Sequence, residues 1–328
     1  MLFHVLHIEA KYEHEHQRAA QTQRLRRHPQ RAYSVPDLDR IHQKCDPHGI
    51  YKFHQVGHQR HAWYVRTRPG ARKVFEEIWD TKDLACSYDG SCWMPGDEKA
   101  PKDSFWCHSD QAPTQEGTVC VQGIVGLTDN KEKTLVVWHR THTIHRELFE
   151  AIGRGKDSAR WQRVPNEYEK KLAPLRLALH IPAGSIALFD SRTFHQNQYG
   201  NDSKEERVVQ YVCMLPKSDP LYRKSAAKRR KYFEERRTIS HWPYPLKVSG
   251  LQPQTYGDPT LRIDYGSLPA PDLDDLMPLI EPQFRHSTQN HFFSMSCLSL
   301  VLLITGGAIG QYMVLTSRLY FMYPSASP

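Results

Sequence analysis

The sequence has no C-x-x-C pair, no internal repeat and no long low-complexity tract. Its cysteines are an odd number, seven, at positions 45, 86, 92, 107, 120, 213 and 297. Structural zinc sites and disulfide scaffolds need paired cysteines, so this pattern argues against both and favours a reducing compartment. The N-terminal segment MLFHVLHIEAKYEHEH also lacks the apolar run of a signal peptide, because His4, His7 and Glu9 interrupt it.

The composition is that of a folded chain, with 39% hydrophobic and 24% charged residues among 328. This length suits one large domain or two small ones. The formal net charge of +8 bears on association with acidic partners rather than on fold.

Residues 292–317 contain no charged side chain. A bilayer-spanning helix needs about 20 mostly apolar residues, so we predict a transmembrane helix here, with a buried hydrophobic helix as the alternative. Gly306 and Gly310 have the G-x-x-x-G spacing that lets two such helices approach, which predicts a possible homodimer. The excess of Lys and Arg before the span predicts a tail-anchored membrane protein whose main domain faces the cytoplasm. Without the anchor the protein would be cytoplasmic.

The pattern divides the chain into five parts. Residues 1–50 are a polar N-terminal extension, 51–282 the main domain, 283–291 a linker and 318–328 a short tail after the span. The main domain includes a basic helix at 222–237, which is either a solvated face or a contact for anionic lipid. It also includes a proline-rich extended segment, 241–282, that we expect to wrap around the core.

Several short alternating stretches predict strands within the main domain. Residues 118–127 and 134–139 predict two antiparallel strands, two more surround the turn at 182–184, and another begins at Arg207. A helix is expected from Pro69, because Val74, Phe75, Ile78 and Trp79 have helical spacing. The predicted fold class is mainly β with flanking helices, of the sandwich or jelly-roll kind.

Four polar residues follow this pattern in the order that an iron(II) oxygenase site requires. His108 and Asp110 form an H-x-D pair before the strand at 118–127, and His195 comes just after a buried strand. Two histidines and one carboxylate hold non-haem iron(II) and leave other coordination positions open. Arg207 opens the next strand, where its guanidinium could pair with a carboxylate of 2-oxoglutarate. The alternatives are a hydrogen-bonded loop pair, a core histidine and a surface ion pair with Glu205 or Glu206.

The chain resembles the phytanoyl-CoA dioxygenase-like family of Fe(II)/2-oxoglutarate-dependent oxygenases. The resemblance spans about 51–282 and includes VRTRPGARKVFEEIW, HSDQAP, VQGIVGLTDN, GSIALFDSRTFHQN and RVVQYVCMLPKS. It implies a double-stranded β-helix core, with His108, Asp110 and His195 as iron ligands and Arg207 as the 2-oxoglutarate anchor. Arg192 and Gln122 are further candidates for the co-substrate site; a loop-fixing arginine and a structural amide are the alternatives.

The resemblance also implies the reaction. Fe(II), 2-oxoglutarate and dioxygen, with ascorbate as a supporting reductant, would hydroxylate a C–H bond of a small-molecule or lipid-like substrate and release succinate and carbon dioxide. Asp110 favours hydroxylation, since halogenating relatives lack this carboxylate. A nucleic-acid substrate is not expected, because Cys213 stands where dealkylating relatives carry a second arginine.

One departure from the family lies in the loop His139–His142, where Arg140 replaces a glycine that usually serves a tight turn. This change, together with the predicted anchor, motivates a second hypothesis of a non-catalytic scaffold or binding protein with the same fold. A zinc-loaded hydrolase is a third, disfavoured because no general base is evident beside the metal.

Overall fold

The computed structural model describes residues 4–7, as backbone only, and 48–96, 102–201, 204–253, 255 and 257–285. These residues belong to one compact unit that ends at Arg285. Most of the predicted extension 1–50, part of the linker 283–291, the predicted span 292–317 with its two glycines, and the tail 318–328 lie outside the described residues. Within the described ranges, no helix is long and apolar enough to cross a bilayer.

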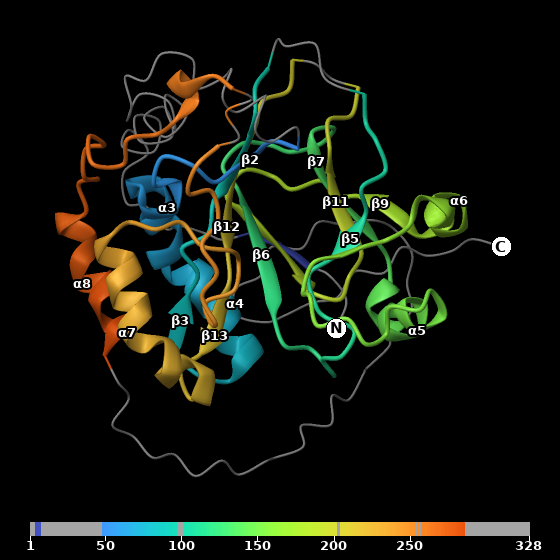
Figure 1. Cartoon of the computed structure of the whole chain (residues 1–328), viewed down its shortest axis with the longest axis horizontal. Coiled ribbons are helices and arrows are strands. Elements are labelled where there is room, and N and C mark those ends of the chain that lie inside the picture. The colour runs from blue at the N-terminus through green and yellow to red at the C-terminus, as the bar shows by residue number, and fades with distance from the viewer. Residues whose placement is uncertain are drawn as a thin grey trace. The chain divides into compact units, whose positions relative to one another are not determined.

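Two antiparallel sheets form the centre of this unit (Figure 1). The larger sheet contains, in spatial order, β1 (His4–His7), β10 (Ser185–Asp190), β6 (Val121–Gly126), β12 (Arg207–Val212), β4 (Ser91–Met94) and β2 (Ile50–Tyr51). The smaller sheet contains β8 (Gln162–Arg163), β5 (His108–Ser109), β11 (His195–Gln198), β7 (Thr134–Trp138) and β9 (Arg176–Ala178). A two-stranded sheet pairs β13 (Met214–Pro216) with β3 (Leu84–Cys86).

Many consecutive strands alternate between the two large sheets, although β7, β8 and β9 all belong to the smaller one. The chain passes from β4 in the larger sheet to β5 in the smaller, then to β6 and β7 in the same alternation, and it repeats this from β9 to β12. The predicted strands at 118–127 and 134–139 are therefore present as β6 and β7. They are not partners, however: β6 pairs with β10 and β12, whereas β7 pairs with β11 and β9.

A hydrophobic layer fills the space between the sheets. Ile124, Phe189 and Val209 of the larger sheet pack in one cluster with Leu135 and Val137 of the smaller sheet. Alternate residues of a strand face the same side, so Gln122 and Arg207 lie on the inner face with Ile124 and Val209. The fold thus directs the polar side chains of Gln122 and Arg207 from the larger sheet toward the smaller one.

Helices cover the outer faces of both sheets (Figure 1). On the outer side of the larger sheet lie α3 (Arg60–Thr67), α4 (Pro69–Trp79), α7 (Pro220–Glu234) and α8 (Met277–Ile280). On the outer side of the smaller sheet lie α5 (His145–Ala151) and α6 (Glu169–Leu172). Trp63 and Phe75 bury their rings against Val125 and Ile186. Short 3-10 turns complete the described helices: η1 (Val56–His58), η2 (Thr141–Thr143), η3 (Asn166–Tyr168), η4 (Ala173–Leu175), η5 (Pro259–Leu261), η6 (Asp274–Leu276) and η7 (Glu281–Phe284).

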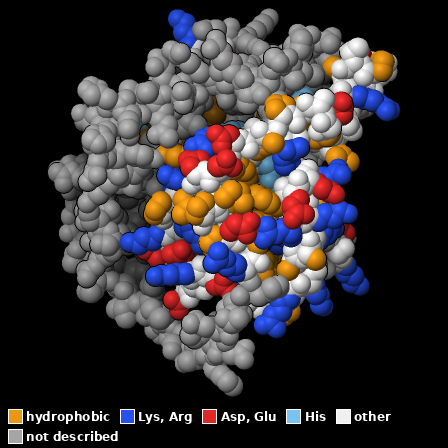
Figure 2. Space-filling model, turned by 90° about the vertical axis from the view of Figure 1, so that its left-hand side faces the viewer, with side chains coloured by type: hydrophobic (Ala, Val, Ile, Leu, Met, Phe, Trp, Pro, Cys, Tyr) orange, Lys and Arg blue, Asp and Glu red, His pale blue; other side chains and the backbone are white. Residues whose placement is uncertain are grey.

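The predicted basic helix 222–237 corresponds to α7, which begins earlier because Asp219 caps Leu221 and Pro220 occupies the first turn. Its cations do not form one positive face. Arg229 is buried and donates to backbone carbonyl groups, and Arg230 pairs with Glu281. Figure 2 shows that Lys and Arg side chains on this side of the molecule alternate with Asp and Glu around hydrophobic side chains.

The fold class predicted from sequence, mainly β with flanking helices, is correct, and the helix expected from Pro69 is α4. The segment 241–282 packs on the core through Trp242, Tyr244 and Ile280, although it contains η5, η6 and α8 rather than extended chain alone. Helix α3 was not predicted. Five cysteines in the described ranges, 86, 92, 107, 120 and 213, are buried free thiols.

Candidate metal centre

Strand pairing brings the H-x-D pair to the second histidine. In the smaller sheet β5 lies antiparallel to β11, and His108 stands directly opposite His195. Asp110 follows β5, and its backbone N–H donates to the Ser191 carbonyl, 2.9 Å away, in the turn that precedes His195. These contacts bring all three side chains to one end of the smaller sheet.

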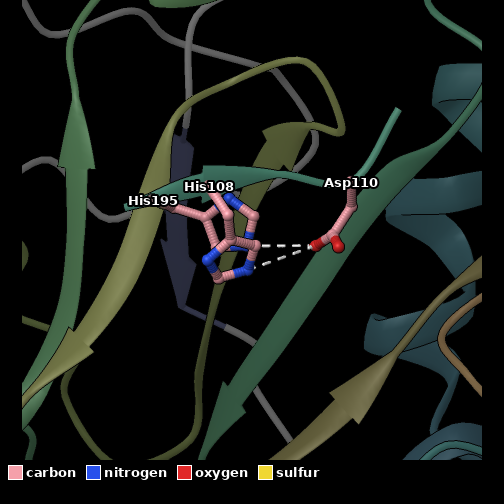
Figure 3. A group of neighbouring side chains, drawn as sticks. All are labelled: His108, Asp110 and His195. Atoms are coloured by element: carbon pink, nitrogen blue, oxygen red, sulfur yellow. Dashed lines mark ion pairs between the residues drawn. The ribbon is translucent and has the colours of Figure 1, made fainter. Parts of the chain in front are cut away.

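The three side chains converge on a common point (Figure 3). Nε2 of His195 lies 3.1 Å from Oδ2 of Asp110, and Nε2 of His108 lies 3.8 Å from the same oxygen. One ligand atom from each residue lies within 4.8 Å of the others, and all three residues are buried. The donor set, two imidazole nitrogens and a carboxylate oxygen without thiolate, is the one that non-haem iron(II) uses.

Backbone carbonyls fix the orientation of both imidazoles. Nδ1 of His108 lies 3.2 Å from the Trp106 carbonyl oxygen, and Nδ1 of His195 lies 2.9 Å from the Thr193 carbonyl oxygen. A carbonyl can only accept, so each Nδ1 carries the proton, and each Nε2 has a free lone pair. This is the tautomer that a metal ligand requires, and the second hydrogen bond holds the ring in place.

Aromatic packing restricts the two rings further. Trp106 stacks on His108 with ring centroids 4.9 Å apart, and His48 stacks on the far side of Trp106 at 3.8 Å. Phe189, from the larger sheet, contacts His195 at 4.7 Å. The ligand geometry is therefore largely established by packing before any ion binds.

Burial and neighbouring charge keep the ligands in their metal-binding protonation states. Burial, followed by the nearby charge of His195, lowers the pKa of His108 to about 3, against opposing contributions from Asp110 and the Trp106 carbonyl. The imidazole of His108 is thus neutral near pH 7. Burial alone would raise the pKa of Asp110, but the neighbouring imidazoles of His241, His195 and His108 bring it below the usual range. Neutral imidazole and ionised carboxylate are the forms that bind metal.

Gln122 lies next to the metal ligands. Its Nε2 donates to Oδ2 of Asp110 at 2.9 Å, across from the larger sheet, where Gln122 belongs to β6. The structure therefore places this candidate co-substrate residue on the carboxylate ligand, where it orients Asp110.

Arg207 has a free guanidinium end in the interior. Its side chain is fully buried, and its Nε donates to Oδ1 of Asn130 at 3.0 Å. Nη1 and Nη2 have no hydrogen-bond partner among the described residues. Buried polar groups are almost always paired, so two unpaired N–H groups on one buried arginine fit a bound carboxylate.

Arg192, the other candidate anion-binding arginine, is engaged within the protein. Its Nε and Nη2 donate to the two carboxylate oxygens of Asp190 at 2.9 and 2.7 Å, and Nη2 also reaches Thr118. This fork fixes the turn between β10 and β11 that leads to His195. The structure does not bring Arg192 to the metal ligands by any hydrogen bond in the described residues.

The loop His139–His142 still forms a tight turn, although Arg140 stands where a glycine was expected. Arg140 adopts the left-handed conformation, with φ 62° and ψ 6°, which a glycine would adopt without strain. Thr141 fixes the loop: its hydroxyl donates to the Trp138 carbonyl and accepts from the Phe194 N–H, 2.7 and 2.8 Å away. The loop therefore still contacts the residue that precedes His195.

Sequence reasoning missed Asn130 and His241. Asn130 orients Arg207, and His241 supplies the largest favourable charge effect on Asp110. Asn130 ends the stretch VQGIVGLTDN, but nothing local marks it as a partner of Arg207, which lies 77 residues later. His241 lies beyond the quoted motifs. Only the tertiary fold brings both residues to the site.

No known protein-family model matches the chain. It is 28% identical over 205 residues to Ava biosynthesis cluster protein O of Aspergillus versicolor, an alignment that covers 58% of this chain and 66% of that protein. The chain thus spans just under two thirds of the length of this curated relative.

Several solved structures resemble the chain. EctD from S. alaskensis, solved with 2-oxoglutarate and 5-hydroxyectoine, is 16% identical, with 66% of this chain and 72% of EctD covered and a TM-score of 0.42. The epimerase SnoN, solved with Fe3+, alpha ketoglutarate and nogalamycin RO, is 14% identical, covering 65% and 78%, with a TM-score of 0.44. HygX from Streptomyces hygroscopicus, solved with nickel and 2-oxoglutarate, is 10% identical, covering 65% and 81%, with a TM-score of 0.42. The functional argument rests on the residues of the site rather than on these likenesses.

Proposed function

We propose that this chain is an Fe(II)- and 2-oxoglutarate-dependent oxygenase that hydroxylates a C–H bond. The observation that carries the proposal is the pairing of two features in one interior. Two free Nε2 atoms and a carboxylate oxygen converge within 4.8 Å, and Arg207 presents two unpaired N–H groups on the inner face. A structural metal site would not require the second feature, whereas an oxygenase that uses a dicarboxylate requires both.

Each residue of the site has its own role in the proposed reaction. His108, Asp110 and His195 would hold the iron and leave its remaining positions open for 2-oxoglutarate and dioxygen. Gln122 keeps Asp110 oriented, and Arg207 would bind the carboxylate of 2-oxoglutarate that lies away from the metal. The bound iron supplies the activation of dioxygen. The reaction balances as R–H, dioxygen and 2-oxoglutarate giving R–OH, succinate and carbon dioxide, with ascorbate keeping the iron reduced.

The topology supports a double-stranded β-helix for the core. From β4 to β7 (with β3 apart) and from β9 to β12, consecutive strands alternate between the two facing sheets, and the ligands lie at the end of the smaller sheet. The carboxylate of Asp110 favours hydroxylation, because it occupies the position that a halogenating enzyme would leave to halide.

The membrane anchor remains a proposal that rests on the uncharged stretch 292–317 alone. If the anchor is present, we further propose that the catalytic unit faces the cytoplasm and that two chains pair through Gly306 and Gly310. The proposed substrate is a small or lipid-like molecule. Expressing the chain with and without 292–317 and comparing their recovery in the membrane fraction tests the anchor. Equal recovery in the soluble fraction would remove the anchor from the proposal.

The test of the function is succinate formation. Protein purified without oxygen and supplied with Fe(II), ascorbate and 2-oxoglutarate should release succinate in air, even without substrate, as slow uncoupled turnover. The variant His108→Ala should release none, while His180→Ala, which removes an exposed histidine, should match the parent. A scaffold would bind 2-oxoglutarate weakly or not at all, and Arg207→Ala would then change nothing. Zinc rather than iron in anaerobically purified protein would favour a hydrolase.

A further inference from the structure

Two pairs of neighbouring residues, Arg160–Trp161 and His241–Trp242, meet beside the candidate metal centre. Strand β8 lies antiparallel to β5, with Ser109 opposite Gln162. Continuing this register by one residue brings Trp161 to the level of Asp110. The segment before β8 is thus held against the H-x-D pair by the sheet itself.

Ring contacts join the two pairs to the site. The indole of Trp161 lies against the ligand His108, with ring centroids 5.5 Å apart, yet Trp161 is 51% exposed. The guanidinium of Arg160 stacks on the ring of Trp242 at 3.7 Å, and the His241 ring lies 5.6 Å from Trp242. An aromatic side chain that contacts a metal ligand and still faces solvent offers a surface to an incoming molecule.

The polar groups of this cluster lack partners. Arg160 makes no hydrogen bond or ion pair with any described residue, and its guanidinium stacks on the face of Trp242. Nε2 of His241 and Nε1 of Trp242 are buried and also have no hydrogen-bond partner in the part of the chain that the structure describes. Stacking of arginine on tryptophan is common as a purely structural contact. It uses only the face of the guanidinium, however, and leaves its N–H donors available.

The charges around the proposed site favour an anion. The formal charges of iron(II), Asp110, 2-oxoglutarate and Arg207 cancel. Arg160 then adds one positive charge for which no carboxylate partner exists among the described residues. Burial lowers the pKa of Arg160, which shows that the surroundings disfavour its charge as they stand. An anionic group on a bound molecule would relieve this cost.

Building on the proposed function, we propose that Arg160 binds an anionic oxygen group, a carboxylate or a phosphate ester, of the substrate, while Trp161 supports the substrate's apolar body beside His108. His241 hydrogen-bonds to the same molecule through Nε2. The substrate class is thus a small acid with an apolar or aromatic body, oxidised at a carbon away from its charged end.

The test compares matched acids and amides. The parent protein, loaded with Mn(II) and 2-oxoglutarate, is titrated calorimetrically with benzoate, phenylacetate, 3-phenylpropanoate and 4-phenylbutyrate, and with their primary amides. At least one acid should bind about tenfold more tightly than its amide, as a charge-assisted hydrogen bond to arginine implies. Phenyl phosphate distinguishes the two sources of the anion: tighter binding than phenylacetate selects a phosphate ester, and weaker binding selects a carboxylate.

Two variants make the test specific. Arg160→Gln should abolish the preference for the acid, whereas Lys156→Gln, which removes the same charge from an exposed position nearby, should retain it. Equal binding of acids and amides to the parent, no binding of any probe, or a preference that survives Arg160→Gln would each overturn the proposal. So would a tenfold loss of 2-oxoglutarate affinity in Arg160→Gln, since Arg160 would then bind the co-substrate.

The proposed acid site and the proposed oxygenase function can each be refuted without refuting the other. Release of succinate by the parent, with no preference for acids, would refute the acid site and leave the oxygenase intact. A preference that depends on Arg160, with no succinate formed under any condition, would leave an anion-binding site and refute the oxygenase.

Discussion

Nε2 of His195 lies 3.1 Å from Oδ2 of Asp110. Because Nδ1 of His195 carries the proton of the ring, Nε2 and the ionised carboxylate oxygen both present lone pairs and cannot hydrogen-bond to each other. Two buried acceptors this close need a cation between them. A bound metal ion accepts both lone pairs at once, so the contact favours an occupied site.

Removing a ligand should remove the metal. We expect Asp110→Ala to weaken Mn(II) binding by more than about 100-fold, since loss of supporting contacts alone costs 10- to 100-fold in comparable sites. Titration followed by electron paramagnetic resonance of free Mn(II) measures this directly. Asp274→Ala, which changes an exposed carboxylate, is the control and should bind as the parent does. Parent-like affinity in Asp110→Ala would refute the assigned ligand set.

Gln122 should tune metal affinity through Asp110. Its hydrogen bond holds the ligand oxygen, so Gln122→Leu should weaken Mn(II) binding by about tenfold while leaving the fold intact. Gln122→Glu should weaken it as well, because a second carboxylate cannot donate when ionised. If Gln122→Leu binds Mn(II) as tightly as the parent, the amide has no role in positioning Asp110.

Substitutions of Arg207 and Arg192 should affect different properties: 2-oxoglutarate binding for Arg207 and stability for Arg192. Arg207→Gln should raise the Kd for 2-oxoglutarate by about 100-fold, as expected when one partner of a buried charge pair is lost, with Mn(II) binding unchanged. Arg192→Gln breaks the fork with Asp190 and should instead lower the free energy of unfolding by about 1 to 3 kcal/mol. Calorimetry with 2-oxoglutarate and urea denaturation measure the two effects. Weaker 2-oxoglutarate binding in Arg192→Gln, together with lower stability alone in Arg207→Gln, would contradict both assignments.

Sequence alone was enough to single out His108, Asp110 and His195, which the fold brings together, because an H-x-D pair and a later histidine follow strands whose alternation is visible. The assignment of Arg207 to 2-oxoglutarate stays a prediction. Sequence was not enough for Asn130, which orients Arg207, or for His241 beside Asp110. Nor could it assign β6 and β7 to different sheets. Alternation shows that a strand is half buried, whereas its partner depends on the path of the whole chain.

Arg140 provides a test of backbone strain. A side chain in the left-handed conformation costs of order 1 kcal/mol relative to glycine, so Arg140→Gly should raise the free energy of unfolding by about that amount. Arg140→Ala retains a Cβ and should bring no such gain. Urea denaturation of the three proteins gives the comparison. Equal gains in both variants would mean that the arginine side chain, rather than its backbone conformation, is unfavourable.

Asp89 should make stability depend on pH. Burial raises its pKa to about 7, despite opposing contributions from Arg66 and the Gly90 N–H. The folded-state pKa lies above the unfolded one, so the stability contributed by protonated Asp89 is present at pH 4 and is lost as the pH rises through 7. Asp89→Asn should remove this loss. Its advantage over the parent should grow between about pH 4 and pH 7, by at most about 1.4 kcal/mol per pH unit, and should level off above pH 7.

Urea denaturation of metal-free protein at each pH measures the effect. The exposed residue Asp274 provides the matched control, since Asp274→Asn should show the same pH dependence as the parent. A constant difference between Asp89→Asn and the parent across this range would show that the carboxyl of Asp89 does not titrate there.

The passage of consecutive strands between two sheets has a kinetic consequence. The pairing of His108 with His195 joins residues distant in the chain, and such topologies of high contact order fold slowly, because loop entropy is lost before the contacts that compensate it form. No stretch of the nascent chain can assemble the ligand set locally. Acquisition of metal should therefore await the pairing of β5 with β11, so that during synthesis the chain cannot hold iron before His195 has been made and the smaller sheet has formed.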